Sequence, residues 1–124
     1  MSRTNFENLR VYKLSEDLAD EIWNIVLRWD RFARDTVGKQ IVRSADSAGA
    51  NIAEGTGRND FQDNRRFVKI VRESLNETQH FLRRAFKRKL LTSADVKKIK
   101  PLGDNLAPQL NSYWKSIGRE HPDE

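Results

Sequence analysis

Apolar residues recur at helical spacing through almost the whole of this 124-residue chain, and this period constrains the fold more than any other feature. Between residues 14 and 29, and again between 37 and 52, they follow one another at intervals of three or four, which puts them on one face of a helix. Sustained alternation with the period of two that marks strands is absent, as are Asn-Gly and Asp-Gly hairpin turns. The pattern predicts an all-α protein.

Four helices are expected, at about residues 12–31, 36–54, 60–90 and 94–117. Residues that cap helix N-termini precede the last three of them: Asp35 or Thr36, Asn59 or Asp60, and Thr92 or Ser93. Short connections favour an up-down-up-down antiparallel four-helix bundle, a single domain over residues 1–124.

Other local signals refine the ends of these helices. Residues 9–11 are expected to be a short extended lead-in, and residues 119–124 a frayed tail. Gly55 is suited to a left-handed conformation that ends the second helix. Pro101 and Pro108 are expected to kink or interrupt the fourth helix.

The residues needed for common kinds of catalysis are missing or scattered. The chain has no Cys, which excludes disulfides, thiolate zinc sites and Cys nucleophiles. His80 and His121 have no partner at metal-ligand spacing. Four carboxylates lie in the first half of the first helix, where compensation of the helix dipole explains them more simply than a metal ion: Glu16, Asp17, Asp20 and Glu21. We therefore expect no enzyme activity, metal or cofactor.

The chain also lacks signals for membranes and nucleotides. No apolar run approaches the ~18 residues of a membrane span, and the N-terminus lacks the apolar core of a signal peptide, so we expect a cytoplasmic protein. The stretch Gly55-Thr56-Gly57-Arg58 has no preceding strand and no following Gly-Lys-Ser/Thr. Helix termination explains its glycines better than a phosphate loop does.

The net charge of +5 comes from one segment. Residues 64–100 contain 12 Lys or Arg and three Asp or Glu, a net charge of +9. Residues 1–63, with nine basic and 11 acidic residues, and residues 101–124, with two and four, each carry −2. An anionic partner would therefore be expected to bind the third helix or the start of the fourth.

On a helical projection, part of this charge forms a polar ridge within an ~80° sector at about 100° per residue. The ridge comprises Arg65, Lys69, Arg72, Asn76, His80, Arg83 and Lys87. It spans roughly 33 Å, contains no acidic residue and is projected opposite the apolar face. The predicted nucleic-acid-binding residues are its five cations, Arg65, Lys69, Arg72, Arg83 and Lys87, assisted by Arg84, Arg88 and Lys89. A solvated helix face, with the last cations placed by the helix dipole, is the alternative.

One string of residues resembles a known family. Asn51-Ile52-Ala53-Glu54-Gly55, followed by Gly57-Arg58, resembles the most recognisable motif of the bacterial four-helix bundle proteins encoded by intervening sequences in 23S ribosomal RNA genes. The accessory variability proteins of diversity-generating retroelements share that fold. Two further segments resemble the family: Leu9-Arg10-Val11-Tyr12 and Glu73-Ser74-Leu75-Asn76-Glu77. The resemblance covers roughly residues 6–117.

The resemblance implies a homopentameric ring that binds nucleic acid or a reverse transcriptase without catalysis. It also implies a structural role for the motif, in which Asn51, Glu54 and Arg58 tie together the turn after the second helix, beside Gly55 and Gly57. Two hypotheses follow. The first is an oligomeric accessory protein that binds the phosphates of RNA or DNA through the ridge. The second is a scaffold that docks a reverse transcriptase or another acidic protein.

Overall fold

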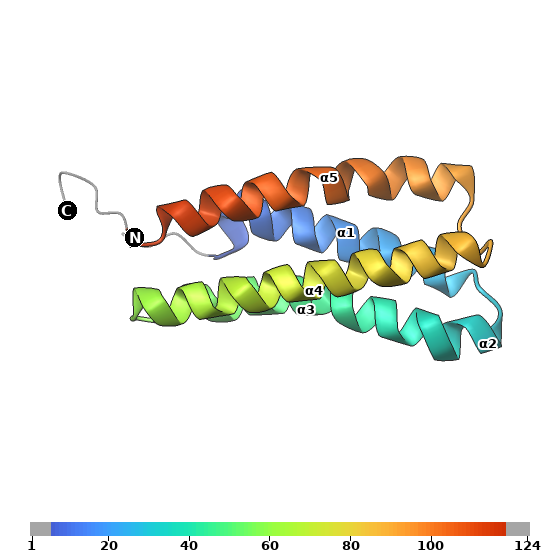
Figure 1. Cartoon of the computed structure of the whole chain (residues 1–124), viewed down its shortest axis with the longest axis horizontal. Helices are drawn as coiled ribbons and strands as arrows, with labels where there is room; N and C mark the ends of the chain where they lie inside the picture. Colours follow the sequence, from blue (N-terminus) through green and yellow to red (C-terminus); the bar gives the residue numbers. More distant parts are fainter. Residues whose placement is uncertain (1–5, 119–124) are drawn as a thin grey trace.

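A computed structural model describes residues 6–118, which are helical apart from short turns and contain no strand. Four long helices lie side by side along the length of the molecule, and a short helix, α2, lies at one end (Figure 1). The elements in chain order are a 3₁₀ turn at Phe6–Asn8, α1 at Arg10–Leu27, α2 at Arg31–Ala33, a π-helical turn at Arg34–Gly38, α3 at Lys39–Thr56, α4 at Phe61–Lys87 and α5 at Ser93–Ser116. The prediction of an all-α chain with four main helices is confirmed.

Helix α1 begins earlier and ends earlier than predicted. The predicted extended lead-in is wrong, because only Leu9 is extended and it serves as the N-cap of α1. Trp29 lies beyond the end of α1 but is still buried. Its indole N–H donates to the Leu90 carbonyl at 2.8 Å, which holds the connection after α1 against the end of α4.

The second helical segment begins at residue 31 rather than 36. Asp30 is its N-cap, and the carboxylate accepts a hydrogen bond from the Ala33 N–H. The predicted cap of Asp35 or Thr36 is wrong, because both residues lie inside the π-helical turn that joins α2 to α3. Asp30 caps this segment because its carboxylate accepts a hydrogen bond from a backbone N–H that the helix itself leaves unpaired.

Small residues allow α3 and α4 to approach each other closely. Ser44 and Thr78 share a buried hydrogen bond of 2.9 Å, and Ser47 and Ser74 share another of 2.9 Å. Gly55 is buried within α3, where a Cβ would lie 2.6 Å from the Asn64 side-chain oxygen. The predicted left-handed role of Gly55 is therefore wrong, since this glycine is helical and provides space for α4.

The N-caps of α4 and α5 are among the residues predicted for these positions. Asp60 caps α4, and Thr92 forms a reciprocal capping box with Asp95 at the start of α5. Helix α5 continues through Pro101 and Pro108, so these two prolines do not interrupt it. Gly118, which follows α5, has a φ of 81°, a left-handed conformation that glycine adopts readily. The frayed tail predicted at 119–124, which includes His121, lies outside the described residues.

The core joins apolar side chains from all four long helices. The largest fully buried apolar side chains are those of Ile22, Ile41, Ile52, Val68, Val71, Leu106 and Leu110. They come from the predicted apolar faces, so helical periodicity identified the buried side of each helix. Within residues 6–118, no helix is both long enough and apolar enough to cross a membrane.

Candidate nucleic-acid interface

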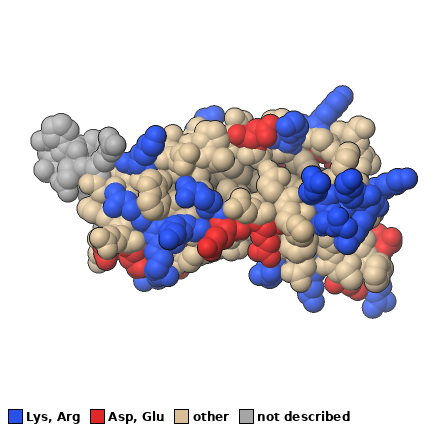
Figure 2. Space-filling model, in the orientation of Figure 1, with Lys and Arg blue, Asp and Glu red and all other residues tan. Residues whose placement is uncertain are grey.

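The predicted basic residues form two groups on the surface rather than one continuous ridge. On the face that α4 crosses, Lys and Arg gather toward each end of the bundle, with Asp and Glu between them (Figure 2). The two groups come from the first and the last turns of α4. Between them along the helix lie Glu73 and Glu77, and Glu77 pairs with Arg43 of α3 at 3.1 Å.

The first group is partly engaged with α5. Arg65 is half-buried, and its guanidinium donates to the carbonyl of Ile117 at 2.6 Å, just beyond the end of α5. Arg72 is exposed but donates to the side-chain oxygen of Asn111 at 3.2 Å. Both guanidinium groups also approach the Trp114 ring, to 5.8 and 6.0 Å from its centroid. These arginines help to hold α4 and α5 together.

The position of these contacts changes the predicted shape of the ridge. Its first half borders α5, and Asn76 lines a hollow between α4 and α5, so this part does not stand opposite the core as projected. Lys69 is exposed and pairs with no acid among residues 6–118.

The second group keeps its cations unpaired. It comprises Arg83, Arg84, Lys87, Arg88 and Lys89. None of them forms an ion pair within the described part of the chain, and all except the half-buried Arg84 are exposed. Three of the five lie at or beyond the last residue of α4, where the helix dipole favours positive charge.

The backbone after α4 turns sharply and presents these cations at the end of the bundle. The Leu90 N–H donates to the Ala85 carbonyl at 2.9 Å, and the Lys89 N–H donates to the Phe86 carbonyl at 3.0 Å. This is a Schellman turn, with Lys89 at its left-handed position. We call the second group, together with Lys97 and Lys98 of α5, the basic end.

Lys97 and Lys98 were not among the predicted site residues. Both are exposed in the second turn of α5, which the short connection after α4 brings to the same end of the molecule (Figure 1). The signal that could have found them is the brevity of that connection combined with the predicted cap at Thr92.

The acids near the basic end are already engaged. Asp95 accepts a hydrogen bond from Arg28, Asp35 lies 3.6 Å from Arg31, and Asp30 caps α2. The carboxylates of Asp35 and Asp95 neutralise arginines outside the basic end, whose seven cations outnumber the single remaining carboxylate of Asp30. Such a surface attracts polyanions, and the attraction weakens as salt is added.

The family-like motif lies at the opposite end of α4. Arg58 pairs with Glu54 at 3.0 Å and with Asp63 at 3.5 Å, and its guanidinium stacks 4.8 Å from the centroid of Phe67. These contacts join the end of α3 to the start of α4. Asn51 instead donates within α3, to the Ser47 carbonyl at 2.8 Å.

The glycines of this motif have different surroundings. Gly55 is buried against α4, whereas Gly57 is the exposed C-cap of α3, with a φ of −80° that any residue can adopt. The close approach of α3 and α4 therefore explains why residue 55 is a glycine, whereas neither space nor backbone conformation requires a glycine at residue 57.

The structure offers little support for a metal centre. Within the described ranges, no three His, Cys, Asp or Glu side chains come together as metal ligands. Burial, and then the charge of the Asp20 carboxylate, raises the pKa of the Asp46 carboxyl above its ordinary value of 3.8. Two carboxylates without a third ligand do not resemble a typical hard-cation site.

The fold and this surface define a small four-helix bundle with a cluster of exposed basic residues where α4 ends. Residues 7–112 match the family described as 23S rRNA-intervening sequence protein, and the chain belongs to that family. The family indicated by the motif from Asn51 to Arg58 is thus confirmed. A comparison with curated proteins gives no match.

A solved structure shows the same fold. It is that of a protein of unknown function from the S23 ribosomal protein family of Bacteroides thetaiotaomicron VPI-5482. The two sequences are 25% identical, and the structures align with a TM-score of 0.73. The alignment covers 85% of this chain and 98% of the other.

Proposed function

We propose that this protein is a non-enzymatic, oligomeric accessory protein that binds nucleic acid through the basic surface of α4. The observation that carries the proposal is the second group of cations, which have no acidic partner among residues 6–118. Arg83, Lys87, Arg88 and Lys89 contact phosphates most directly, and Arg84 assists. Lys69 and the exposed Arg72 extend the contact along the helix, while Arg65 mainly supports the packing of α5.

Phosphate binding of this kind is governed by counterion release. Each phosphate neutralised on duplex DNA makes the logarithm of the affinity fall by about 0.9 per tenfold rise in salt. Contacts to phosphates carry no sequence information, so the binding is expected to be largely independent of sequence.

The test compares two triple variants of equal charge. One replaces Arg83, Lys87 and Arg88 with Gln, and the control replaces Arg10, Lys13 and Lys115 with Gln, which are exposed in the first turn of α1 and the last turn of α5. In filter binding to a 30-base-pair duplex, the first variant should lower both the affinity and the salt slope, and the control should lower them much less. Equal effects of the two variants, with both still folded by circular dichroism, would reject the assigned surface.

We also propose that the chain assembles as a homopentameric ring of up-down-up-down bundles, as the family resemblance implies. The topology is supported by contacts between opposite helix ends, such as that of Arg65 with Ile117. Large apolar side chains on the surface, including Trp23, Leu27 and Phe86, support the assembly. Five copies would repeat the basic end, so that weak contacts sum by avidity. Light scattering over a range of concentrations tests the stoichiometry, and a monomer at all concentrations would reject it.

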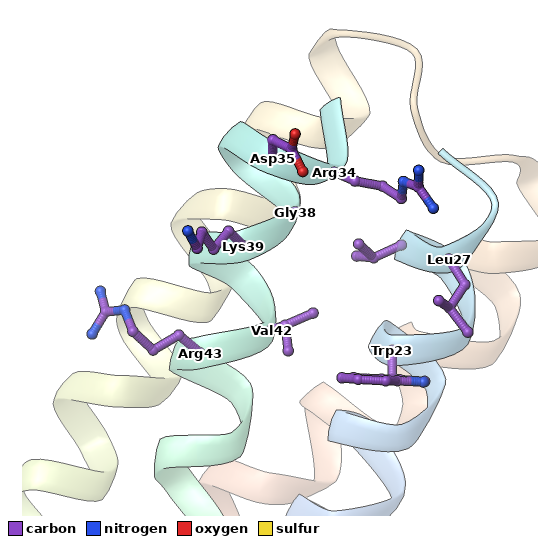
Figure 3. Close-up of a pocket in the computed structure, with 9 residues that line it drawn as sticks. Trp23, Leu27, Arg34, Asp35, Gly38, Lys39, Val42 and Arg43 are labelled. Carbon is purple, nitrogen blue, oxygen red and sulfur yellow. The ribbon is translucent and has the colours of Figure 1, made fainter. Parts of the chain in front are cut away.

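A second candidate function is a scaffold that docks an acidic protein, for example a reverse transcriptase, as in the retroelement accessory proteins that share the fold. The observation favouring it is a groove of about 310 Å³ between α1 and α3. Trp23 and Leu27, which are 52% and 55% exposed, form one wall and Val42 lies on the other (Figure 3). Arg34 reaches across one end of the groove toward α1, while Lys39 and Arg43 point away (Figure 3).

The two candidate functions respond differently to nuclease. If the protein is a scaffold, a purified reverse transcriptase encoded beside it should remain bound after nuclease treatment, and Leu27→Glu should release it. If binding depends on nucleic acid, nuclease should release the enzyme from the wild type and the groove variant alike.

A further inference from the structure

Phe32 is the most exposed large apolar side chain of the described structure, and it stands beside the basic end. Its exposed fraction is 79%. It lines a hollow of about 450 Å³ together with residues of α2, the π-helical turn and the end of α4. The other lining residues are Asp30, Ala33, Thr36, Val37, Arg88 and Leu90.

Several contacts fix the position of Phe32 relative to Arg88. The Asp30 cap orders the first turn of α2, in which Phe32 is the second residue. The Thr36 hydroxyl donates to the Phe32 carbonyl at 2.7 Å. The Trp29 indole binds the Leu90 carbonyl and so ties this segment to the turn that follows α4. The hollow is therefore built by two segments that are far apart in the sequence.

The chemistry of the hollow combines an aromatic face with a free cation. Ala33, Val37 and Leu90 give it apolar walls, and the aromatic ring of Phe32 is open to solvent. Arg88 forms no ion pair within residues 6–118, and its neighbours Lys87 and Lys89 are likewise unpaired. An exposed aromatic ring beside cations is the combination by which proteins bind single-stranded nucleic acid.

We infer that this hollow takes an unpaired nucleobase, stacked on Phe32, while Arg88 and its lysine neighbours hold the adjoining phosphates. The inference rests on the proposed function and narrows its ligand to single-stranded RNA or DNA, including loops and frayed ends. A base inside a duplex is already stacked on both faces, so it cannot present a face to Phe32. The Asp30 carboxylate, which also lines the hollow, accepts the Ala33 N–H and can accept an N–H of the base, such as that of uracil N3, as well.

The charge around this hollow favours a nucleic acid over an apolar protein as its ligand. The nearby acids Asp35 and Asp95 are paired with Arg31 and Arg28. The cations of the basic end form no ion pair among residues 6–118, so an apolar partner would leave them unneutralised or bury them at a cost. The phosphates of a single strand neutralise them while a base covers the exposed ring.

The test uses fluorescence anisotropy with a labelled 12-nucleotide oligouridylate and a duplex of the same length. Phe32→Ala should weaken binding of the single strand by about 5- to 100-fold. It should leave duplex binding and the salt slope unchanged, because no cation is removed. Phe32→Trp should retain the affinity, since indole also stacks. The control is Phe61→Ala, which removes another exposed aromatic ring at the opposite end of α4.

Two outcomes would overturn the inference while leaving the proposed function intact. In one, Phe32→Ala binds the single strand as tightly as the wild type does. In the other, Phe32→Ala and Phe61→Ala weaken binding of the single strand to the same extent. A change in oligomeric state on Phe32→Ala, measured by light scattering, would also overturn it, because Phe32 would then belong to a protein interface. Failure of the wild type to bind either oligonucleotide would reject the proposed function and the inference together.

Discussion

Arg28, just beyond the end of α1, donates a hydrogen bond to the carboxylate of Asp95 in the first turn of α5. The Asp95 side chain is buried, while that of Arg28 is more than half exposed. The same carboxylate accepts the backbone N–H of Thr92 at 2.9 Å, which completes the capping box. One side chain thus begins α5 and joins it to the end of α1.

Replacing Asp95 with Asn should lower the free energy of unfolding by about 1–3 kcal/mol. The variant weakens a helix cap and a charge-assisted hydrogen bond to a buried group. Urea denaturation measures the loss. Asp104→Asn serves as the control, because Asp104 makes only an exposed pair with Lys100, which is worth about 0–1 kcal/mol. Equal losses for the two variants would contradict a special role for Asp95.

The same carboxylate should make stability depend on pH in the acid range. Burial raises the pKa of Asp95, but hydrogen bonds from Thr92 and Arg28 and the charge of Arg28 outweigh burial, so the pKa lies below its ordinary value of 3.8. Because the pKa is lower in the folded state, the stabilisation is complete well above pH 3.8 and is lost as the pH falls through the folded pKa. The stability difference between wild type and Asp95→Asn should therefore shrink below about pH 4. A difference that stays constant from pH 6 to pH 2.5 would contradict this linkage.

Lys89→Gly should stabilise the fold while weakening phosphate binding. Lys89 has a φ of 62°, a left-handed conformation that costs a residue with a Cβ about 1 kcal/mol more than glycine. The melting temperature should rise, and affinity for an oligonucleotide should fall because a cation is lost. Arg88→Gly is the control: Arg88 has a φ of −86°, so its replacement should weaken binding without raising the melting temperature.

Gly55→Ala should destabilise the protein by about 1–3 kcal/mol, although alanine favours helices. Its Cβ would lie 2.6 Å from the Asn64 oxygen and 2.9 Å from the Phe67 Cβ, so α3 and α4 would have to separate. Gly57→Ala is the matched control, because a Cβ there would lie 3.5 Å from the Glu54 carbonyl oxygen, an ordinary van der Waals contact. Thermal melts of both variants test the prediction. Equal stability of the two variants would contradict it, because α3 and α4 would then accommodate the added Cβ at no cost.

The buried faces of the helices were largely predictable from the sequence. Ile22, Ile41 and Leu106 are buried as their spacing indicated, because a period of 3.6 residues puts each apolar stripe on one side of a helix before any partner is specified. The caps at Asp60 and Thr92 were predictable for a similar reason, since they involve residues two or three positions apart. Asp30 was missed as a cap because the first helix was predicted to continue to residue 31, whereas α1 ends at Leu27.

The candidate site was predictable only in part. The sequence by itself determined the helical class, the buried faces and the placement of the positive charge in one segment, because all three follow from composition and short-range spacing. Only the tertiary structure decided which cations other side chains and carbonyls engage: Arg65 meets Ile117 across 52 positions, whereas Arg88 lies beside Phe32 and has no acidic partner in the described part of the chain. Contacts between distant segments depend on how the helices pack, and the period of a single helix does not specify that packing.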